Sequence, residues 1–187
     1  DASIGGKTAV NHTLGKNLIG AFHQPRLVLA DTDALRTLPR AEVVAGLAEV
    51  IKHGIIRDPE LFDFLEQHID DVADMRIDAD QLDWLIERNA QIKADVVSAD
   101  EREGGLRAIL NYGHTIGHAI EAATAYKQYR HGEAVLLGMI AAGELAARRG
   151  MWVDDAERQR HDRLVEHPGL PGGIGRVDAA TIAERTK

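Results

Sequence analysis

Five polar side chains recur every three or four residues in the segment LRAILNYGHTIGHAIEA, and their types are those that bind metals and anions. They are Arg107, Asn111, His114, His118 and Glu121, at successive spacings of 4, 3, 4 and 3 residues. On one continuous helix these positions fall within a stripe about 80° wide. We therefore predict a helix over residues 106–123 with a single polar face.

The other faces of this predicted helix are apolar or small, which is typical of a buried helix. Gly113 and Gly117 would also let a neighbouring backbone come close. A buried polar group without a partner costs about 1–3 kcal/mol, so the stripe needs protein groups, a metal or a polar substrate to bind. The alternative is a solvent-facing stripe, but such faces are usually rich in lysine and this one has none.

Two further segments carry side chains that could complete a metal site. Glu49 and Lys52 share a helical face in AGLAEVIKHG, and His131 lies in RHGEA. Two histidines and one glutamate with an open fourth position form a known catalytic zinc set, in which the metal polarises a substrate oxygen. The i, i+4 spacing nominates His114 and His118, but the residues alone do not rank this pair against His131.

Simpler interpretations exist for each segment. Glu49 and Lys52 could form an exposed ion pair worth under about 1 kcal/mol, although the apolar neighbours of Glu49 indicate partial burial. His131 could serve only to cap a helix. The metalloprotease pattern H-E-x-x-H is absent, because Thr115 follows His114.

The opening DASIGGKT contains a GKT like that of phosphate-binding P-loops. The full pattern needs a glycine where Asp1 stands, so we reject a P-loop. Lys7, Lys16 and the N–H groups of this glycine-rich stretch could still bind phosphate, and an ordinary surface loop is an equal alternative.

The composition restricts the class of protein. The chain has 187 residues and a net charge of −8, which argues against nonspecific nucleic-acid binding. The absence of cysteine excludes thiolate nucleophiles and Cys-type zinc sites, and leaves the 9 histidines as metal candidates. No apolar run is long enough for a membrane helix and no signal peptide is visible, so we expect a cytoplasmic protein.

The elements that position these residues are predicted to be almost all helices, which makes the fold mainly α. Residues 1–25 are predicted to be a loop, and residues 26–31 (RLVLAD) a single strand whose sheet lies outside this chain. Periodicity and capping residues predict helices over about residues 37–54, from 58 through 69, from 80 through 96, over 106–123 and 131–150, from 154 or 155, and after Asp178.

Five motifs, in order and at similar spacing, resemble those of the 3-dehydroquinate synthase family of the shikimate pathway. They are DASIGGKTAVNHTLGKNLIGAFHQP, LADTDALRTLP, AGLAEVIKHGII, ADEREGGLRAILNYGHTIGHAIEA and HGEAVLLGM. The resemblance extends from Asp1 to about Gly150 and is weaker beyond. Related sugar-phosphate cyclases share much of it.

This resemblance implies a two-domain enzyme, in which an N-terminal α/β domain binds NAD and a C-terminal helical domain carries most of the site. Residues 1–38 would then be the end of the NAD-binding domain, and residues 39–187 the helical metal- and substrate-binding domain. The chain would be a fragment that lacks most of the NAD pocket and is inactive alone. The resemblance also implies a homodimer.

The family's functional residues carry over position by position. The resemblance implies that zinc, or alternatively cobalt, is bound by Glu49, His114 and His131, which leaves His118 as a nearby acid–base or hydrogen-bonding group. The implied NAD contacts are Lys7, Lys16, Ala34, Leu35, Arg36 and Thr37. The implied catalytic and substrate contacts are Asp1, Lys7, Asn17, Lys52, Lys93, Arg107, Asn111 and His118.

The implied reaction converts 3-deoxy-D-arabino-heptulosonate 7-phosphate to 3-dehydroquinate by transient oxidation with NAD, phosphate elimination, re-reduction, ring opening and aldol closure. The substrate is anionic at both ends, so an acidic protein must gather its cations locally. Arg107 suits a planar carboxylate or phosphate, and Lys93 can add a second charge. Two alternatives stay open: another sugar-phosphate cyclase, such as a deoxy-inosose or valiolone synthase, and a helical binding domain without catalysis.

Overall fold

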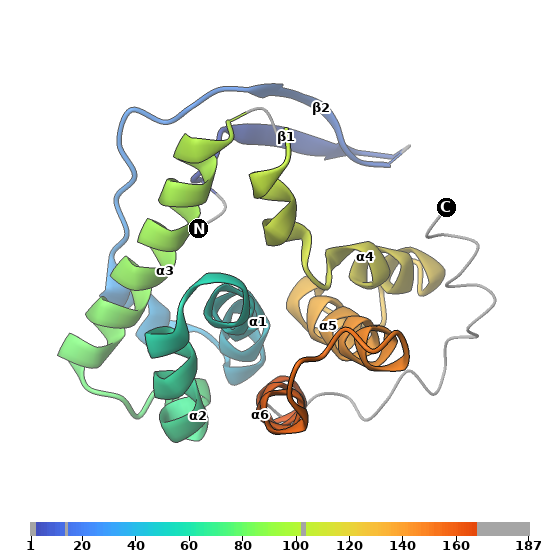
Figure 1. Cartoon of the computed structure of the whole chain (residues 1–187). Coiled ribbons are helices and arrows are strands. Elements are labelled where there is room, and N and C mark those ends of the chain that lie inside the picture. The colour runs from blue at the N-terminus through green and yellow to red at the C-terminus, as the bar shows by residue number, and fades with distance from the viewer. Residues whose placement is uncertain (1–2, 14, 102–103, 168–187) are drawn as a thin grey trace.

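The computed structural model describes residues 3–13, 15–101 and 104–167, and within them the chain is mainly α-helical, as predicted (Figure 1). The elements are β1 (Lys7–His12), β2 (Gly15–Phe22), the 3-10 helix η1 (Thr32–Thr37), α1 (Arg40–Arg57), α2 (Pro59–Ala73), α3 (Ala79–Ala99), the 3-10 helix η2 (Leu106–Asn111), α4 (His114–Ala123), α5 (His131–Arg148) and α6 (Asp155–Glu166). None of the helices in these ranges is both long and apolar enough to cross a bilayer.

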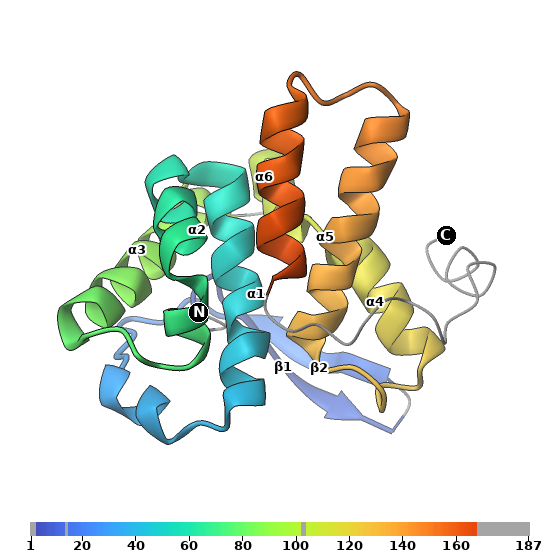
Figure 2. The ribbon, with the colours of Figure 1, turned by 90° about the horizontal axis from the view of Figure 1, so that it is seen from below.

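Helix α1 lies at the centre of the helical body. Figure 1 shows α3 on one side of it and α4 with α5 on the other, and the view from below shows α6 beside both α1 and α5 (Figure 2). Side chains from α1, α2, α3, α5 and α6 form one core, whose fully buried members include Ile51, Leu61, Leu65, Leu136, Met139 and Val165. This core fixes α1 against α5, which is the contact that positions the candidate site.

Local capping groups set the starts of α2, α3 and α6 close to where the sequence predicts them. Asp58 caps α2 with Pro59 in its first turn, and Asp78 forms a capping box with Gln81 at the start of α3. The start of α1 differs from the prediction, because Thr37 ends η1 and the helix begins at Arg40. The predicted helix after Asp178 lies outside the described residues.

The N-terminal segment contradicts two predictions. Residues 26–31 form no strand, since no neighbouring strand among the described residues pairs with them, and Leu27 and Leu29 are 73% and 86% exposed. The stretch predicted as a loop instead contains an antiparallel hairpin, with Lys7 opposite Phe22. Glycine favours the pairing here, because a Cβ at Gly20 would lie 2.3 Å from the Thr8 carbonyl oxygen.

Asp58 joins two helices, and we expect Asp58→Ala to destabilise the protein by about 1–2 kcal/mol. Its carboxylate accepts hydrogen bonds from the N–H groups of Glu60 and Leu61, both at 3.1 Å, and pairs with Arg88 of α3. The helix cap and the link to α3 are therefore lost together. Urea unfolding at pH 7 measures the change, with the exposed Asp80→Ala as the control in the first turn of α3.

The same carboxylate predicts a pH dependence of the stability. The hydrogen bond from Arg88 is the largest of the causes that hold the pKa of Asp58 below its ordinary value. A carboxyl with a lowered folded-state pKa stabilises the fold above its unfolded-state pKa, and this contribution disappears as the pH falls through the folded-state pKa. Between pH 5 and pH 2, the free energy of unfolding should therefore fall less for the Asp58→Ala protein than for wild type. An equal fall in the free energy of unfolding of both proteins would show that Asp58 is not the source of this pH dependence.

Candidate metal centre

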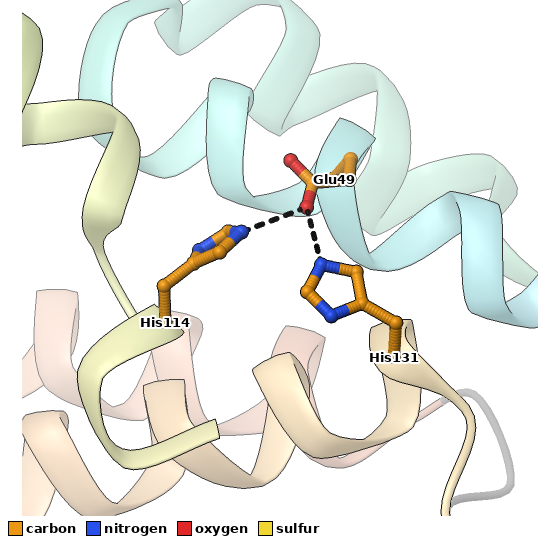
Figure 3. Close-up of side chains that lie close together, drawn as sticks. All are labelled: Glu49, His114 and His131. Atoms are coloured by element: carbon orange, nitrogen blue, oxygen red, sulfur yellow. Dashed lines mark ion pairs between the residues drawn. The ribbon is translucent and has the colours of Figure 1, made fainter. Parts of the chain in front are cut away.

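Three potential metal ligands from distant parts of the chain converge between α1, α4 and α5. Glu49 lies on α1, His114 is the first residue of α4, and His131 is the first residue of α5. The Glu49 Oε1 atom is 3.2 Å from His114 Nε2 and 3.8 Å from His131 Nε2, and Figure 3 shows both rings facing this oxygen. One ligand atom from each residue lies within 4.8 Å of the other two.

This donor set fits a divalent transition metal. Two imidazoles and one carboxylate are the protein ligands of several catalytic zinc sites, which keep a fourth position for water or substrate. Tetrahedral ligands about 2.1 Å from zinc are about 3.4 Å from one another, and the separations of 3.2 and 3.8 Å between Glu49 and the two imidazoles lie on either side of that value. Small rotations of the side chains would therefore suffice for all three to reach one ion.

The ring nitrogens that face away from Glu49 have partners of their own. His114 Nδ1 is 3.2 Å from the backbone carbonyl oxygen of Tyr112, and His131 Nδ1 is 3.1 Å from Glu121 Oε2. Each acceptor requires a proton on Nδ1, because a carbonyl or an ionised carboxylate only accepts. Nδ1 of each ring is thus engaged, and Nε2, the ring nitrogen nearer Glu49, is the atom that would bind a metal.

The second oxygen of Glu49 accepts a hydrogen bond from Lys52. The Nζ atom lies 2.5 Å from Glu49 Oε2, and the Lys52 side chain is only 4% exposed. Burial raises the pKa of the Glu49 carboxyl, but the hydrogen bond with His114 and the Lys52 ammonium outweigh burial and lower it overall. Burial lowers the pKa of the Lys52 ammonium, and the Glu49 carboxylate partly offsets this effect by raising it. Glu49 is therefore held as a carboxylate.

Cationic side chains gather near this carboxylate. Lys93 of α3 is half-buried, and its pKa is lowered overall. Burial is the main cause of the lower pKa, and the charges of Arg107 and Lys7 add to it, whereas the Glu49 carboxylate opposes it. Arg107 is 4% exposed and donates to the carbonyl oxygens of Glu101, at 3.1 Å, and Gly5, at 3.2 Å. Positive charge is thus concentrated in one region that can attract an anionic substrate. The four predicted site residues that supply this charge are Lys7, Lys52, Lys93 and Arg107.

The predicted helix over residues 106–123 is wrong as one element. It is divided into η2 and α4 by Tyr112, which is extended, and by Gly113, whose φ of +77° is in the left-handed region. The predicted polar stripe is therefore broken, with Arg107 and the exposed Asn111 on η2, separate from α4. The break places His114 at a helix start, where its Nδ1 faces the Tyr112 carbonyl.

His118, which local spacing pairs with His114, occupies a different position. Its exposed ring is 5.4 Å from the His114 ring and 5.6 Å from the His131 ring, measured between centroids. It does not belong to the group around Glu49, but forms a second possible metal-binding group with Glu121 and His131. His118 therefore borders the site at the side open to solvent.

The residues predicted to contact NAD lie mostly on two elements. Residues 34–37 belong to η1, where Leu35 packs against the core and Arg36 pairs with Asp33 at 3.1 Å. Lys7 begins β1 and is exposed; only the backbone of Lys16 and of Asn17, in β2, is described. Asp1 lies outside the described residues.

A cavity of about 250 Å³ connects the predicted NAD segment with the metal group, because Leu35 and Glu49 both line it. Asn89 lines the same cavity and is hydrogen-bonded to the fully buried His53. Sequence reasoning did not select His53 or Asn89. A histidine close to the apolar residues Val50, Ile51 and Ile55 was the available signal, since a buried imidazole needs a polar partner.

Relatives of the chain are found among curated enzymes. The synthase of Synechococcus sp. (strain CC9605), named 3-dehydroquinate synthase, is 59% identical over 172 residues, and that of Nostoc punctiforme, with the same name, is 57% identical over 178 residues. Each alignment covers 91% of this chain but only 46% and 47% of the relative. The chain thus spans about half the length of the curated relatives it matches.

Solved structures give a consistent result. ValA, a 2-epi-5-epi-valiolone synthase from Streptomyces hygroscopicus with NAD+ and Zn2+ bound, superposes on the whole chain with a TM-score of 0.88 at 31% identity. A 2-deoxy-scyllo-inosose synthase complexed with carbaglucose-6-phosphate, NAD+ and Co2+ gives a TM-score of 0.85 at 33% identity. This chain covers 51% and 50% of those two chains.

Family profiles match the entire length of the chain. The profile described as "3-dehydroquinate synthase N-terminal" matches residues 1–45, and the one described as "3-dehydroquinate synthase C-terminal" matches residues 46–187. The second profile alone accounts for most of the residues, including all three potential metal ligands. The chain therefore belongs to the 3-dehydroquinate synthase family.

Proposed function

We propose that this chain forms the metal- and substrate-binding half of a 3-dehydroquinate synthase. The observation that carries the proposal is the convergence of Glu49, His114 and His131 beside the buried ammonium of Lys52. The identity of the relatives favours this reaction over that of other cyclases, because curated 3-dehydroquinate synthases are 59% and 57% identical whereas the solved cyclases are 31% and 33% identical.

The proposed cofactors are NAD and zinc, with cobalt as a substitute. The two solved cyclases support this choice, because ValA is bound to NAD+ and Zn2+ and the 2-deoxy-scyllo-inosose synthase to NAD+ and Co2+. Zinc held by Glu49, His114 and His131 would polarise a substrate oxygen. The proposed NAD contacts are Lys7, Lys16 and residues 34–37, and within this last segment Leu35 lines the cavity that also reaches Glu49.

The chain's own side chains supply the remaining chemistry. Lys52 holds a proton at Nζ next to the metal group, and can donate it in a hydrogen bond to a substrate hydroxyl. Lys93 and Arg107 provide positive charge for the carboxylate and phosphate of the substrate. His118, exposed beside both ligand imidazoles, is suited to accept and return a proton.

We further propose the organisation that the family resemblance implies. Residues 1–38 complete an NAD-binding domain together with chain outside this sequence, and residues 39–187 form the helical domain. Asp1, Asn17 and Asn111 contact the substrate in the complete site. The complete enzyme is a cytoplasmic homodimer, and neither NAD binding nor turnover is expected from this chain alone.

A hybrid enzyme tests this function. The chain would replace the corresponding half of the Synechococcus sp. synthase, to which it is 59% identical. With NAD and zinc, the hybrid should convert 3-deoxy-D-arabino-heptulosonate 7-phosphate to 3-dehydroquinate and phosphate. His114→Ala should lower the rate by at least about 100-fold, because it removes a ligand of the group that stabilises developing charge.

Two results would overturn the proposal. One is a folded hybrid that binds NAD and zinc but releases no phosphate from the heptulosonate substrate. The other is a hybrid that forms a carbocycle only from a sugar phosphate that lacks the carboxylate, which would assign the chain to a different cyclase. Retained activity in the His114→Ala hybrid would show that the metal group is not the catalytic centre.

A further inference from the structure

His131 is the least enclosed member of the proposed metal group. Its side chain is 47% exposed, against 15% for His114 and 22% for Glu49. It is also the first residue of α5, so no preceding helical turn surrounds it. Packing alone therefore does not fix the orientation of its ring, and a hydrogen bond must do so if the ring is to keep facing Glu49.

Glu121 supplies that hydrogen bond from the neighbouring helix. Its side chain is only 4% exposed, and its Oε2 atom lies 3.1 Å from His131 Nδ1. Helices α4 and α5 pack closely, because Gly117 of α4 faces the α5 backbone: a Cβ at Gly117 would lie 2.9 Å from the Ala134 carbonyl oxygen. The close packing of the two helices therefore places the buried Glu121 carboxylate beside the start of α5.

The direction of this hydrogen bond has a chemical consequence. A carboxylate accepts from Nδ1–H, so Nδ1 is engaged with Glu121, and Nε2, 3.8 Å from Glu49, is the ring nitrogen left to bind a metal. Carboxylates that accept from a ligand histidine fix its ring and raise its basicity, and their loss typically lowers metal affinity 10–100-fold. Glu121 is placed to act on His131 in this way.

We propose that Glu121 is a positioning residue for the metal site: it orients His131 without binding the ion itself. The inference rests on the proposed metal group of Glu49, His114 and His131. It goes beyond that group, because Glu121 also belongs to a second possible group with His118 and His131, in which it would be a ligand. The two roles predict different behaviour on substitution.

Zinc affinity of the 187-residue chain, measured by competition with a chromophoric chelator, distinguishes the roles. Glu121→Ala should weaken zinc binding about 10–100-fold. Glu121→Gln should restore most of it, because the amide oxygen still accepts from Nδ1–H. Glu87→Ala is the control, because Glu87 is an exposed glutamate on α3 and its removal should leave zinc affinity unchanged. The absorption spectrum of bound Co2+ should keep its four-coordinate form in Glu121→Gln.

The outcomes separate the inference from the proposed function on which it rests. If wild type binds zinc and Glu121→Ala binds it equally well, Glu121 is not a positioning residue and the metal group stands. If Glu121→Gln and His118→Ala both lose zinc binding while Glu49→Ala keeps it, Glu121 is a ligand in the second group and the inference is wrong. If wild type itself binds no zinc, the proposed metal group fails. Melting of the zinc-free proteins shows whether each variant folds.

Discussion

Glu49→Ala is expected to abolish zinc binding by this chain, with a loss of affinity above the roughly 100-fold that follows removal of a residue that only orients a metal ligand. The substitution leaves two imidazoles without the carboxylate that both of them face. It also leaves the buried Lys52 ammonium without its partner at 2.5 Å. The measurement is the melting temperature with and without zinc, since a ligand at 100 times its Kd stabilises by about 2.7 kcal/mol.

Histidine variants provide the matched comparison for Glu49→Ala. His114→Ala and His131→Ala should also lose the zinc-dependent rise in melting temperature, whereas His118→Ala should keep most of it. The three rings are within 5.6 Å of one another, so the variants differ in ligand role more than in location. Loss of zinc in His118→Ala together with retention in His131→Ala would show that the ligand assignment is wrong.

The helices that sequence predicts best are those with local determinants. Asp58 with Pro59, and Asp78 with Gln81, hold the first turns of α2 and α3 through contacts within three residues. Helical periodicity then continues each element, and the mainly α fold follows. The site depends on contacts that are not local, since Glu49 and His131 lie 82 positions apart in the sequence. Residue spacing alone brings together only His114 and His118, and the family resemblance was needed to include the other two.

The errors have a common physical cause, which is that backbone geometry overrides pattern. The polar stripe from Arg107 to Glu121 requires one continuous helix, but Gly113 in the left-handed region ends η2 and begins α4 anew. Glycine permits this conformation, and the pattern of side chains gives no sign of it. Similarly, residues 26–31 have an apolar centre with strand character, yet a strand exists only where another strand supplies its hydrogen bonds.

The crossing of α4 and α5 gives the second large expected effect: Gly138→Ala should destabilise the protein by at least about 2 kcal/mol. A Cβ at this position of α5 would lie 1.9 Å from the Gly113 carbonyl oxygen and 2.9 Å from the Gly117 nitrogen. Both atoms belong to backbone, so the helices themselves must move apart. Because His114 follows Gly113 directly, this displacement should also weaken zinc binding, which chelator competition would detect.

Gly46→Ala is the matched control for Gly138→Ala, since both replace a glycine inside a helix. A Cβ at Gly46, on α1, meets no atom within 4 Å. There the substitution should stabilise by about 0.5–1 kcal/mol, because alanine loses less backbone entropy in a helix. If the two substitutions change the free energy of unfolding in urea in opposite directions, the effect of Gly138→Ala comes from the close approach of two backbones and not from helix propensity. A Gly138→Ala protein as stable as wild type would contradict the packing that places His114 opposite Glu49.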